Sequence, residues 1–148
     1  MLDPARLISP AVPLESIHHI AYIVRDLDEA LPLFEARFGL SVVVREELPD
    51  QQVEALALGI GHGQVELIAP TTPDSGAARF LDARGEGLHH VAYAVTELQS
   101  ELDRLAAEGL ELIDTVPRRG LGGHMVAFIH PKTAGGALTE LVQSTVDH

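Results

Sequence analysis

The chain has 148 residues, of which 46% are hydrophobic and 22% are charged, and its 22 acidic and 10 basic side chains give a formal charge of −12. This hydrophobic content is enough to form a core, so we expect one compact domain or two small halves that share a core. The chain has no cysteine, which excludes disulfides, zinc–thiolate sites, iron–sulfur clusters and thiol nucleophiles. Its negative charge argues against nucleic acid as a partner, because phosphate backbones are also negative.

The sequence also lacks the patterns of membrane and exported proteins. Its hydrophobic runs are far shorter than the roughly 20 residues that a membrane span needs, and its first residues lack a basic and then apolar signal pattern. We therefore expect a cytoplasmic protein with no membrane partner. Residues 1–15 contain Pro4, Pro10 and Pro13 and show little periodicity, which predicts an extended N-terminal arm outside the folded domain.

An internal repeat organises the rest of the chain. Segment 16–24, SIHHIAYIV, matches segment 87–95, GLHHVAYAV. Each copy is followed by a helical stretch that ends in Gly-Leu and later by a strand that contains a glutamate. Landmarks that recur in the same order predict a duplicated β-α-β-β-β unit. We expect a single domain over 16–143, made of modules 16–70 and 87–143, with a short helix and a linker between them over 71–86.

The first module begins with a predicted strand over 17–24. Asp26 or Asp28 is expected to cap the next helix and Gly39 to end it. Pro32 lies past the first turn, so it is expected to kink or restart this helix. Three further strands are predicted at 40–46, 53–58 and 64–68.

The connecting helix is expected to be capped by Asp74 or Ser75 and to end at a linker over 85–87. The second module then repeats the pattern with a strand over 88–95. Thr96 is expected to cap its helix, with Gln99 completing a capping box. Its three remaining strands are predicted near 110–116, 125–129 and 138–143.

Alternation along the two histidine strands predicts which imidazoles face a cavity. Successive side chains of a strand point to opposite faces, so His19 shares a face with Ala21, and His90 shares one with Ala92. Small alanines leave space, which places His19 and His90 in a cavity. His18 and His89 are then expected on the opposite, core side. The alternative for His19 and His90 is an ordinary strand position with a hydrogen bond to a neighbour.

A glutamate in the last strand of each module completes the pattern. Glu66 and Glu140 lie among apolar neighbours, and an unpaired buried charge costs several kcal/mol. If each closing strand lies near the first strand of its module, both glutamates converge on His19 and His90. A divalent metal would satisfy all four groups, and these ligands suit Mn, Fe, Co, Ni or Zn in an open site. The alternative is two His–Glu hydrogen bonds that stabilise a pseudo-symmetric core.

These motifs resemble those of the vicinal oxygen chelate superfamily, with His-x-Ala in the first strand and apolar-Glu-Leu in the last. Within it the sequence is most similar to the methylmalonyl-CoA epimerases, over about residues 16–143. The matching segments are 17–22, 49–51, 66–70, 85–90, 117–123, 130–132 and 136–141. The resemblance implies an α+β fold in which tandem βαβββ units form a curved mixed sheet around a cavity, with helices outside.

The resemblance also implies an isomerase that interconverts (R)- and (S)-methylmalonyl-CoA by removing and returning the α-proton. The metal ligands would be His19, Glu66, His90 and Glu140. The metal would be Co²⁺, or otherwise Mn²⁺, Ni²⁺, Zn²⁺ or Fe²⁺, acting as a Lewis acid on the enolate. Glu140 would also transfer a proton. Glu54 is the nearest candidate for the second acid–base residue, although an ungapped match places Ala55 there.

Other interpretations stay open at this point. The chain could be another metal-dependent member of the superfamily, such as a glyoxalase-like isomerase or a dioxygenase, or a metal-free binding module. Arg118, Arg119 or Lys132 could offset the phosphates of a CoA thioester, or they are exposed solubilising charges. The glycines near 120–123 predict either a close approach to a ligand or a tight hairpin. Open sheet edges favour a homodimer.

Overall fold

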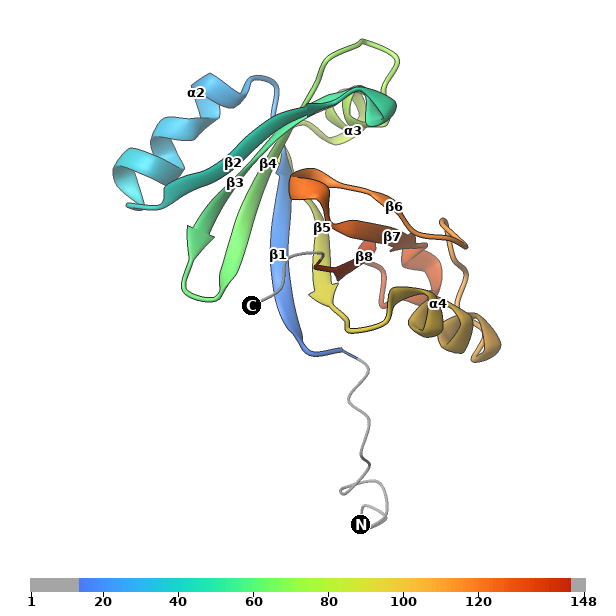
Figure 1. The fold of residues 1–148 in the computed structure, drawn as a ribbon. Helices are drawn as coiled ribbons and strands as arrows, with labels where there is room; N and C mark the ends of the chain where they lie inside the picture. Colours follow the sequence, from blue (N-terminus) through green and yellow to red (C-terminus); the bar gives the residue numbers. More distant parts are fainter. Residues whose placement is uncertain (1–13, 145–148) are drawn as a thin grey trace.

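The structure is a computed structural model that describes residues 14–144, so most of the arm expected over 1–15 lies outside the described residues. Those residues form a mixed sheet of eight strands in the order β2-β3-β4-β1-β5-β8-β7-β6. The sheet curls strongly, with α2 beside its N-terminal half and α4 beside its C-terminal half (Figure 1). This confirms the predicted α+β class and the tandem βαβββ order.

The first module contains β1 (Ser16–Ile23), α2 (Leu27–Pro32), β2 (Ser41–Leu48), β3 (Val53–Ile60) and β4 (Gly63–Pro70). The second contains β5 (Gly87–Ala94), α4 (Leu98–Ala107), β6 (Arg118–Arg119), β7 (Met125–Ile129) and β8 (Thr139–Gln143). Helix α3 (Gly76–Arg84) connects the two modules. Short 3-10 turns lie at Pro49–Gln51, Leu121–Gly123 and Pro131–Thr133.

The two histidine strands lie side by side at the centre of the sheet. β1 and β5 pair antiparallel, β1 pairs parallel with β4, and β5 pairs parallel with β8. The last strand of each module therefore lies beside its first strand, which is the arrangement that the metal hypothesis requires.

The hydrophobic residues divide the two faces of the sheet. On the outer face, Leu27 of α2 and Phe34 pack against Leu56, Leu58 and Leu67 of the strands. The second module packs α4 in the same way, through Leu98, Leu102, Ala127, Ile129 and Leu141. On β3 the large leucines face the helix and the small alanines face inward, so the concave face keeps an open volume.

The first helix follows the sequence prediction closely. The Asp26 carboxylate accepts a hydrogen bond from the backbone N–H of Glu29 at 3.0 Å, so Asp26 is the cap. The α-helix stops at Pro32 and continues as a π-helical turn, Leu33–Arg37. Proline has no N–H to donate, which accounts for this change of hydrogen bonding. Gly39 follows with a φ of +77°, a conformation that favours glycine.

Two predictions for the second module are wrong in detail. Glu97 rather than Thr96 precedes α4, and the backbone N–H of Leu98 donates to Gln143 Oε1 at 2.8 Å. A side chain from β8 therefore replaces the local cap. Residues 110–116 do not form a regular strand, because the Asp114 carboxylate accepts the Phe128 N–H at 2.8 Å in place of a backbone carbonyl. The connecting helix is capped by Ser75, one of the two predicted residues.

Within residues 14–144 we find no helix with the length and hydrophobicity that a membrane crossing requires.

Candidate metal centre

The sheet register brings the four predicted ligands to the concave face. Ala21 on β1 pairs with Glu66 on β4 and with His90 on β5. Ala92 on β5 pairs with His19 on β1 and with Glu140 on β8. Both alanines are fully buried. Each module thus contributes one histidine and one glutamate, and a small residue between them leaves room for their side chains to meet.

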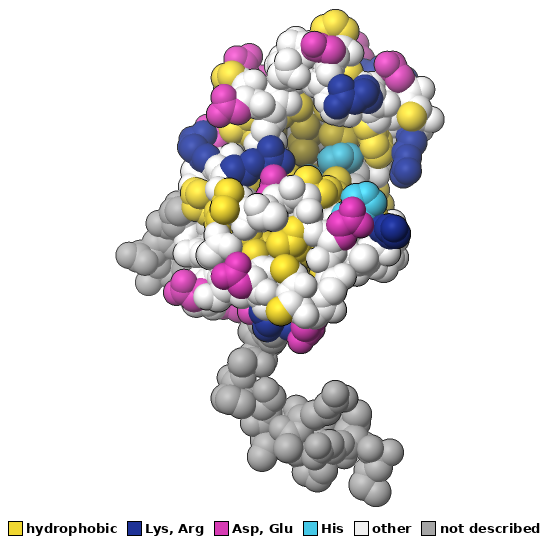
Figure 2. Space-filling model, turned by 90° about the vertical axis from the view of Figure 1, so that its right-hand side faces the viewer, with side chains coloured by type: hydrophobic (Ala, Val, Ile, Leu, Met, Phe, Trp, Pro, Cys, Tyr) yellow, Lys and Arg dark blue, Asp and Glu magenta, His cyan; other side chains and the backbone are white. Residues whose placement is uncertain are grey.

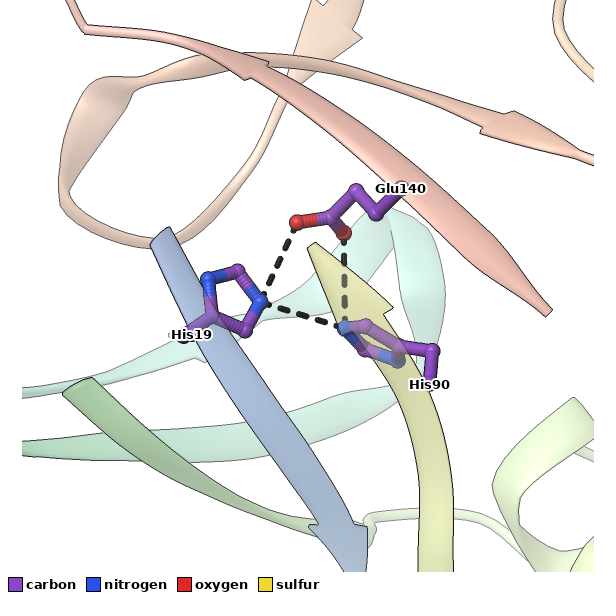
Figure 3. A group of neighbouring side chains, drawn as sticks. All are labelled: His19, His90 and Glu140. Atoms are coloured by element: carbon purple, nitrogen blue, oxygen red, sulfur yellow. Dashed lines mark hydrogen bonds and ion pairs between the residues drawn. The ribbon is translucent and has the colours of Figure 1, made fainter. Parts of the chain in front are cut away.

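Three of these side chains form a compact group (Figure 3). The Nε2 atoms of His19 and His90 are 3.2 Å apart. Glu140 lies against both, with Oε1 at 3.2 Å from His19 Nε2 and Oε2 at 3.7 Å from His90 Nε2. One ligand atom from each residue lies within 4.8 Å of the other two, and all three residues are buried. The cluster therefore joins strands from both modules.

Glu66 adjoins this group without belonging to its compact part. Its Oε2 lies 3.1 Å from His19 Nε2, and the residue is 8% exposed. The compact group of three, with atoms within 4.8 Å of one another, does not include it. Glu66 thus contacts one of the two imidazoles from the β4 side.

The donor set fits a divalent metal ion. Metal–nitrogen bonds are about 2.0–2.1 Å in zinc sites, so two nitrogen ligands of one ion lie roughly 3 to 3.5 Å apart. The 3.2 Å between His19 Nε2 and His90 Nε2 matches this separation. Two carboxylates would balance the charge of a divalent cation, and imidazole with carboxylate suits several such metals.

Without a metal, the buried carboxylates and imidazoles shift each other's protonation. Burial raises the pKa of Glu66, nearby Glu140 adds to this effect, and His19 opposes it. Burial lowers the pKa of His19, but Glu66 and Glu140 outweigh burial and the pKa is raised overall. Burial and His19 hold the pKa of His90 well below its usual value. In the metal-free cluster, His19 and Glu66 therefore bind protons more readily than isolated side chains do, and His90 binds them less readily.

The shift at Glu66 predicts how pH affects the metal-free protein. A raised pKa in the folded state contributes stability at low pH, and that stability is lost as pH rises through the folded-state pKa. Glu66→Gln removes the titration. In excess chelator, we expect the variant to melt above the unaltered protein at pH 8 and close to it at pH 5. Calorimetry across this range measures the difference.

Glu47→Gln, at an exposed position on β2, is the matched control and should leave the pH profile unchanged. A constant difference in melting temperature between Glu66→Gln and the unaltered protein at all pH values would contradict the assignment of this buried charge.

His18 and His89 lie at the cavity, and the prediction that they face the core is wrong. Both line the same cavity as His19 and His90. The β1–β5 register skips His18 between Ile17 and His19, and it skips His89 between the partners of Ala21 and Tyr22. Each histidine is the extra residue of a β-bulge, where the regular alternation of side chains breaks down. The repeated His-His dipeptide was the signal for this arrangement.

The two bulge histidines orient the cluster imidazoles. His18 Nδ1 lies 2.8 Å from His19 Nδ1, and His89 Nδ1 lies 2.9 Å from His90 Nδ1. Each pair shares one proton between its Nδ1 atoms. This leaves the Nε2 atoms of His19 and His90 directed at each other and at Glu140. An outer hydrogen bond of this kind fixes the ring orientation of a metal-binding histidine.

A cavity of about 340 Å³ opens above the cluster. Figure 2 shows a hollow on this face, with hydrophobic side chains and a histidine inside it and Lys or Arg side chains around it. Apolar residues make up much of its lining, including Ile23, Val44, Leu48, Val53, Ala55, Ile68, Leu121, Val126 and Phe128. The hydrogen-bonding groups of the cluster thus lie at one side of a largely apolar pocket, an arrangement typical of small-molecule sites.

Glu54 does not reach this cavity. Because side chains alternate along β3, Ala55 lines the cavity and Glu54 points to the other face. There its Oε1 lies 3.2 Å from Arg45 Nη2, and Arg45 also pairs with Asp28 at 2.7 Å. Glu54, the nearest candidate in the sequence for the second acid–base residue, therefore lies outside the cavity, and Ala55 is the residue that faces it.

The basic residues considered for phosphate binding lie at different places. Arg118 lines the cavity, with its guanidinium 5.4 Å from the centroid of the Phe128 ring. Arg119 lies 3.4 Å from Glu46 on β2. Lys132 is not among the described residues that line the cavity. Arg118 is therefore the basic residue best placed to meet an anionic group of a ligand.

The glycine-rich segment forms a tight connection between β6 and β7 that also lines the cavity. The Gly120 N–H donates to the His124 carbonyl at 2.8 Å, which closes the turn. The Gly122 N–H donates to Glu46 Oε1 at 2.6 Å. Gly122 and Gly123 have φ values of +72° and +81°, which favour glycine. The hairpin interpretation is confirmed, and the turn also lies against the cavity and ties the second module to β2. A close approach to a ligand stays a prediction.

The fold and the cluster define a class of α+β proteins in which a curved mixed sheet carries a buried group of histidines and glutamate with the donor set of a metal site. The family model described as the Glyoxalase/Bleomycin resistance protein/Dioxygenase superfamily matches residues 18–128. The chain belongs to this superfamily.

Individual relatives narrow the comparison. An uncharacterized protein of Bacillus subtilis, YqjC, is 34% identical over 134 residues, which cover 90% of this chain and 96% of the relative. The ethylmalonyl-CoA/methylmalonyl-CoA epimerase of Cereibacter sphaeroides is 31% identical over 129 residues, which cover 86% of this chain and 96% of the relative. The solved structure of a methylmalonyl-CoA epimerase in complex with methylmalonyl-CoA and NH4+ superposes with a TM-score of 0.87 at 32% identity. The superposition covers 90% of this chain and 96% of the epimerase chain. The chain is thus similar to epimerases over nearly its whole folded part.

Proposed function

We propose that this protein is a divalent-metal-dependent epimerase that moves the α-proton of methylmalonyl-CoA or of a closely related acyl-CoA. The observation that carries the proposal is the buried group of His19, His90 and Glu140 at one side of an open apolar cavity. The similarity to epimerases of about the same length supports this substrate class. Glu66 is proposed as the fourth ligand because its carboxylate lies 3.1 Å from His19 Nε2.

The obstacle to this reaction is the carbanion that forms when the α-proton leaves. A divalent ion held by His19, His90, Glu140 and Glu66 would supply Lewis-acid stabilisation of the enolate oxygen. The chain itself orients the ligands through the hydrogen bonds from His18 and His89. The apolar walls limit water around the reacting carbon, which strengthens every charge interaction in the cavity.

Glu140 is proposed as one of the two acid–base groups. Its carboxylate lines the cavity and is held between the two imidazoles at 3.2 and 3.7 Å. A positioned general base contributes roughly 10² to 10⁴ in rate. Arg118 on the same cavity is proposed to meet the carboxylate or a phosphate of the substrate, because guanidinium pairs well with both.

Metal removal and restoration test the proposal. We expect protein loaded with Co²⁺ to catalyse deuterium entry from D₂O at the α-carbon of methylmalonyl-CoA, measured by mass spectrometry. Chelated protein should lose this exchange and regain it when Co²⁺ is added back, because the enolate then has its Lewis acid again. The absence of exchange in metal-loaded protein would overturn the assignment. Oxygen consumption in its place would favour a dioxygenase.

A homodimer stays a prediction. Large hydrophobic side chains are exposed on the central strands, with Ile17 at 60% and Leu88 at 61%, and a second copy could cover them.

A further inference from the structure

Inversion at the α-carbon needs a second acid–base group, since one group must remove the proton from one face and another must return it to the opposite face. The resemblance to the epimerases places this second group on the strand that contains Glu54 and Ala55. Of these two residues, Ala55 lines the cavity, and its methyl group cannot transfer a proton. The second group must therefore come from another part of the cavity lining.

Four titratable residues line the cavity outside the proposed ligand set, counting only the part of the chain that the structure describes. They are His18, His89, Arg118 and His124. Three of them are poor candidates. His18 and His89 use Nδ1 to hold the neighbouring cluster imidazoles at 2.8 and 2.9 Å. Arg118 stays protonated in proteins and lies 3.5 Å from Asp114.

His124 differs from the other three because one of its ring nitrogens is buried without a hydrogen-bond partner in the described part of the chain. Its Nδ1 is buried and has no hydrogen-bond partner among residues 14–144. Buried polar atoms are nearly always paired, so such an atom on a residue that lines the cavity points to a missing partner such as a water molecule or a ligand. The ring packs edge-on against His18, with centroids 5.3 Å apart, which places it next to the cluster.

The surrounding loop holds His124 in place from a different wall of the cavity than Glu140. Glu140 projects from β8 in the sheet, whereas His124 follows the turn Leu121–Gly123. That turn is anchored to β2 by the 2.6 Å hydrogen bond from the Gly122 N–H to Glu46. The ring of His124 also lies close to Gly122, where an added Cβ would meet it at 3.7 Å. A loop tied to both modules gives the imidazole a defined position.

We propose that His124 is the second acid–base catalytic residue, which rests on the proposed epimerase function. From one enantiomer, the Glu140 carboxylate takes the α-proton, and the electron pair of the broken C–H bond forms the enolate. The His124 imidazolium then gives its N–H proton to the opposite face, where a new C–H bond forms. In the reverse direction, neutral His124 takes the proton and protonated Glu140 returns it. Exchange with water restores both groups.

Separate measurements on the two enantiomers of methylmalonyl-CoA test this role. His124→Gln, loaded with Co²⁺ in D₂O, should lose epimerisation by about 10²- to 10⁴-fold. It should still exchange the α-proton of the enantiomer that Glu140 deprotonates and should lose exchange with the other. A purely structural role would slow both enantiomers equally. Added imidazole should partly restore His124→Ala, because it can occupy the vacated space and carry the proton.

The outcomes separate this inference from the proposed function. If the unaltered protein exchanges neither enantiomer, the epimerase proposal fails. If the unaltered protein exchanges both and His124→Gln either keeps both or loses both, the role of His124 is overturned. His62→Gln, at an exposed turn between β3 and β4, is the matched control and should keep both exchange rates. The Co²⁺ affinity of His124→Gln should match that of the unaltered protein, since His124 is not a proposed ligand.

Discussion

Glu140→Gln should lower the rate of α-proton exchange with methylmalonyl-CoA by at least about 10²-fold. The amide keeps the shape of the side chain but cannot accept the α-proton. It also removes one negative charge from the ligand set between His19 and His90, 3.2 and 3.7 Å away. Exchange is measured at saturating Co²⁺, so that loss of the base is separated from loss of the metal. Bound metal is determined on the same sample.

Glu54→Gln provides the matched control for this prediction. It makes the same chemical change on β3, but its carboxylate faces Arg45 outside the cavity. We expect its exchange rate to stay within about 2-fold, because surface ion pairs contribute little. Equal losses for Glu54→Gln and Glu140→Gln would show that the reacting carbon does not lie at the cluster.

His90→Ala should weaken Co²⁺ binding by more than about 100-fold. Loss of a residue that only orients a ligand already costs about 10- to 100-fold, so removal of a direct ligand should cost more. The unaltered protein should melt higher with Co²⁺ than without it, since a ligand at 100 times its Kd stabilises a folded protein by about 2.7 kcal/mol. His90→Ala should lose this gain. Titration calorimetry and thermal melting measure both effects.

His62→Ala is the control for metal binding, because it removes an exposed imidazole at the turn between β3 and β4 that is not a proposed ligand and does not line the cavity. Its Co²⁺ affinity should match that of the unaltered protein. Tight Co²⁺ binding by His90→Ala would instead support the alternative in which histidine and glutamate hydrogen bonds stabilise a pseudo-symmetric core.

The sequence alone was enough to predict the repeat, the fold class and the residues of the cluster. The matched His-His-apolar-Ala segments and the two apolar-Glu-Leu strands are local patterns, and duplication makes each copy support the other. Asp26 and Pro32 acted as predicted because capping and proline effects involve only neighbouring residues. Burial of Glu66 and Glu140 followed from their apolar surroundings.

Tertiary structure decided the details that determine the chemistry. The bulges that bring His18 and His89 to the cavity depend on how β1 and β5 pair. Alternation of side chains along a single strand cannot predict them. The placement of Glu54 outside the cavity depends on the register of β3, since a shift of one residue reverses the face. The position of His124 at the cavity depends on a loop of the second module that is tied to Glu46 of the first. Local sequence determined which groups are present, whereas long-range pairing between strands determined which of them meet, because hydrogen-bonded register is a property of two chain segments and not of one.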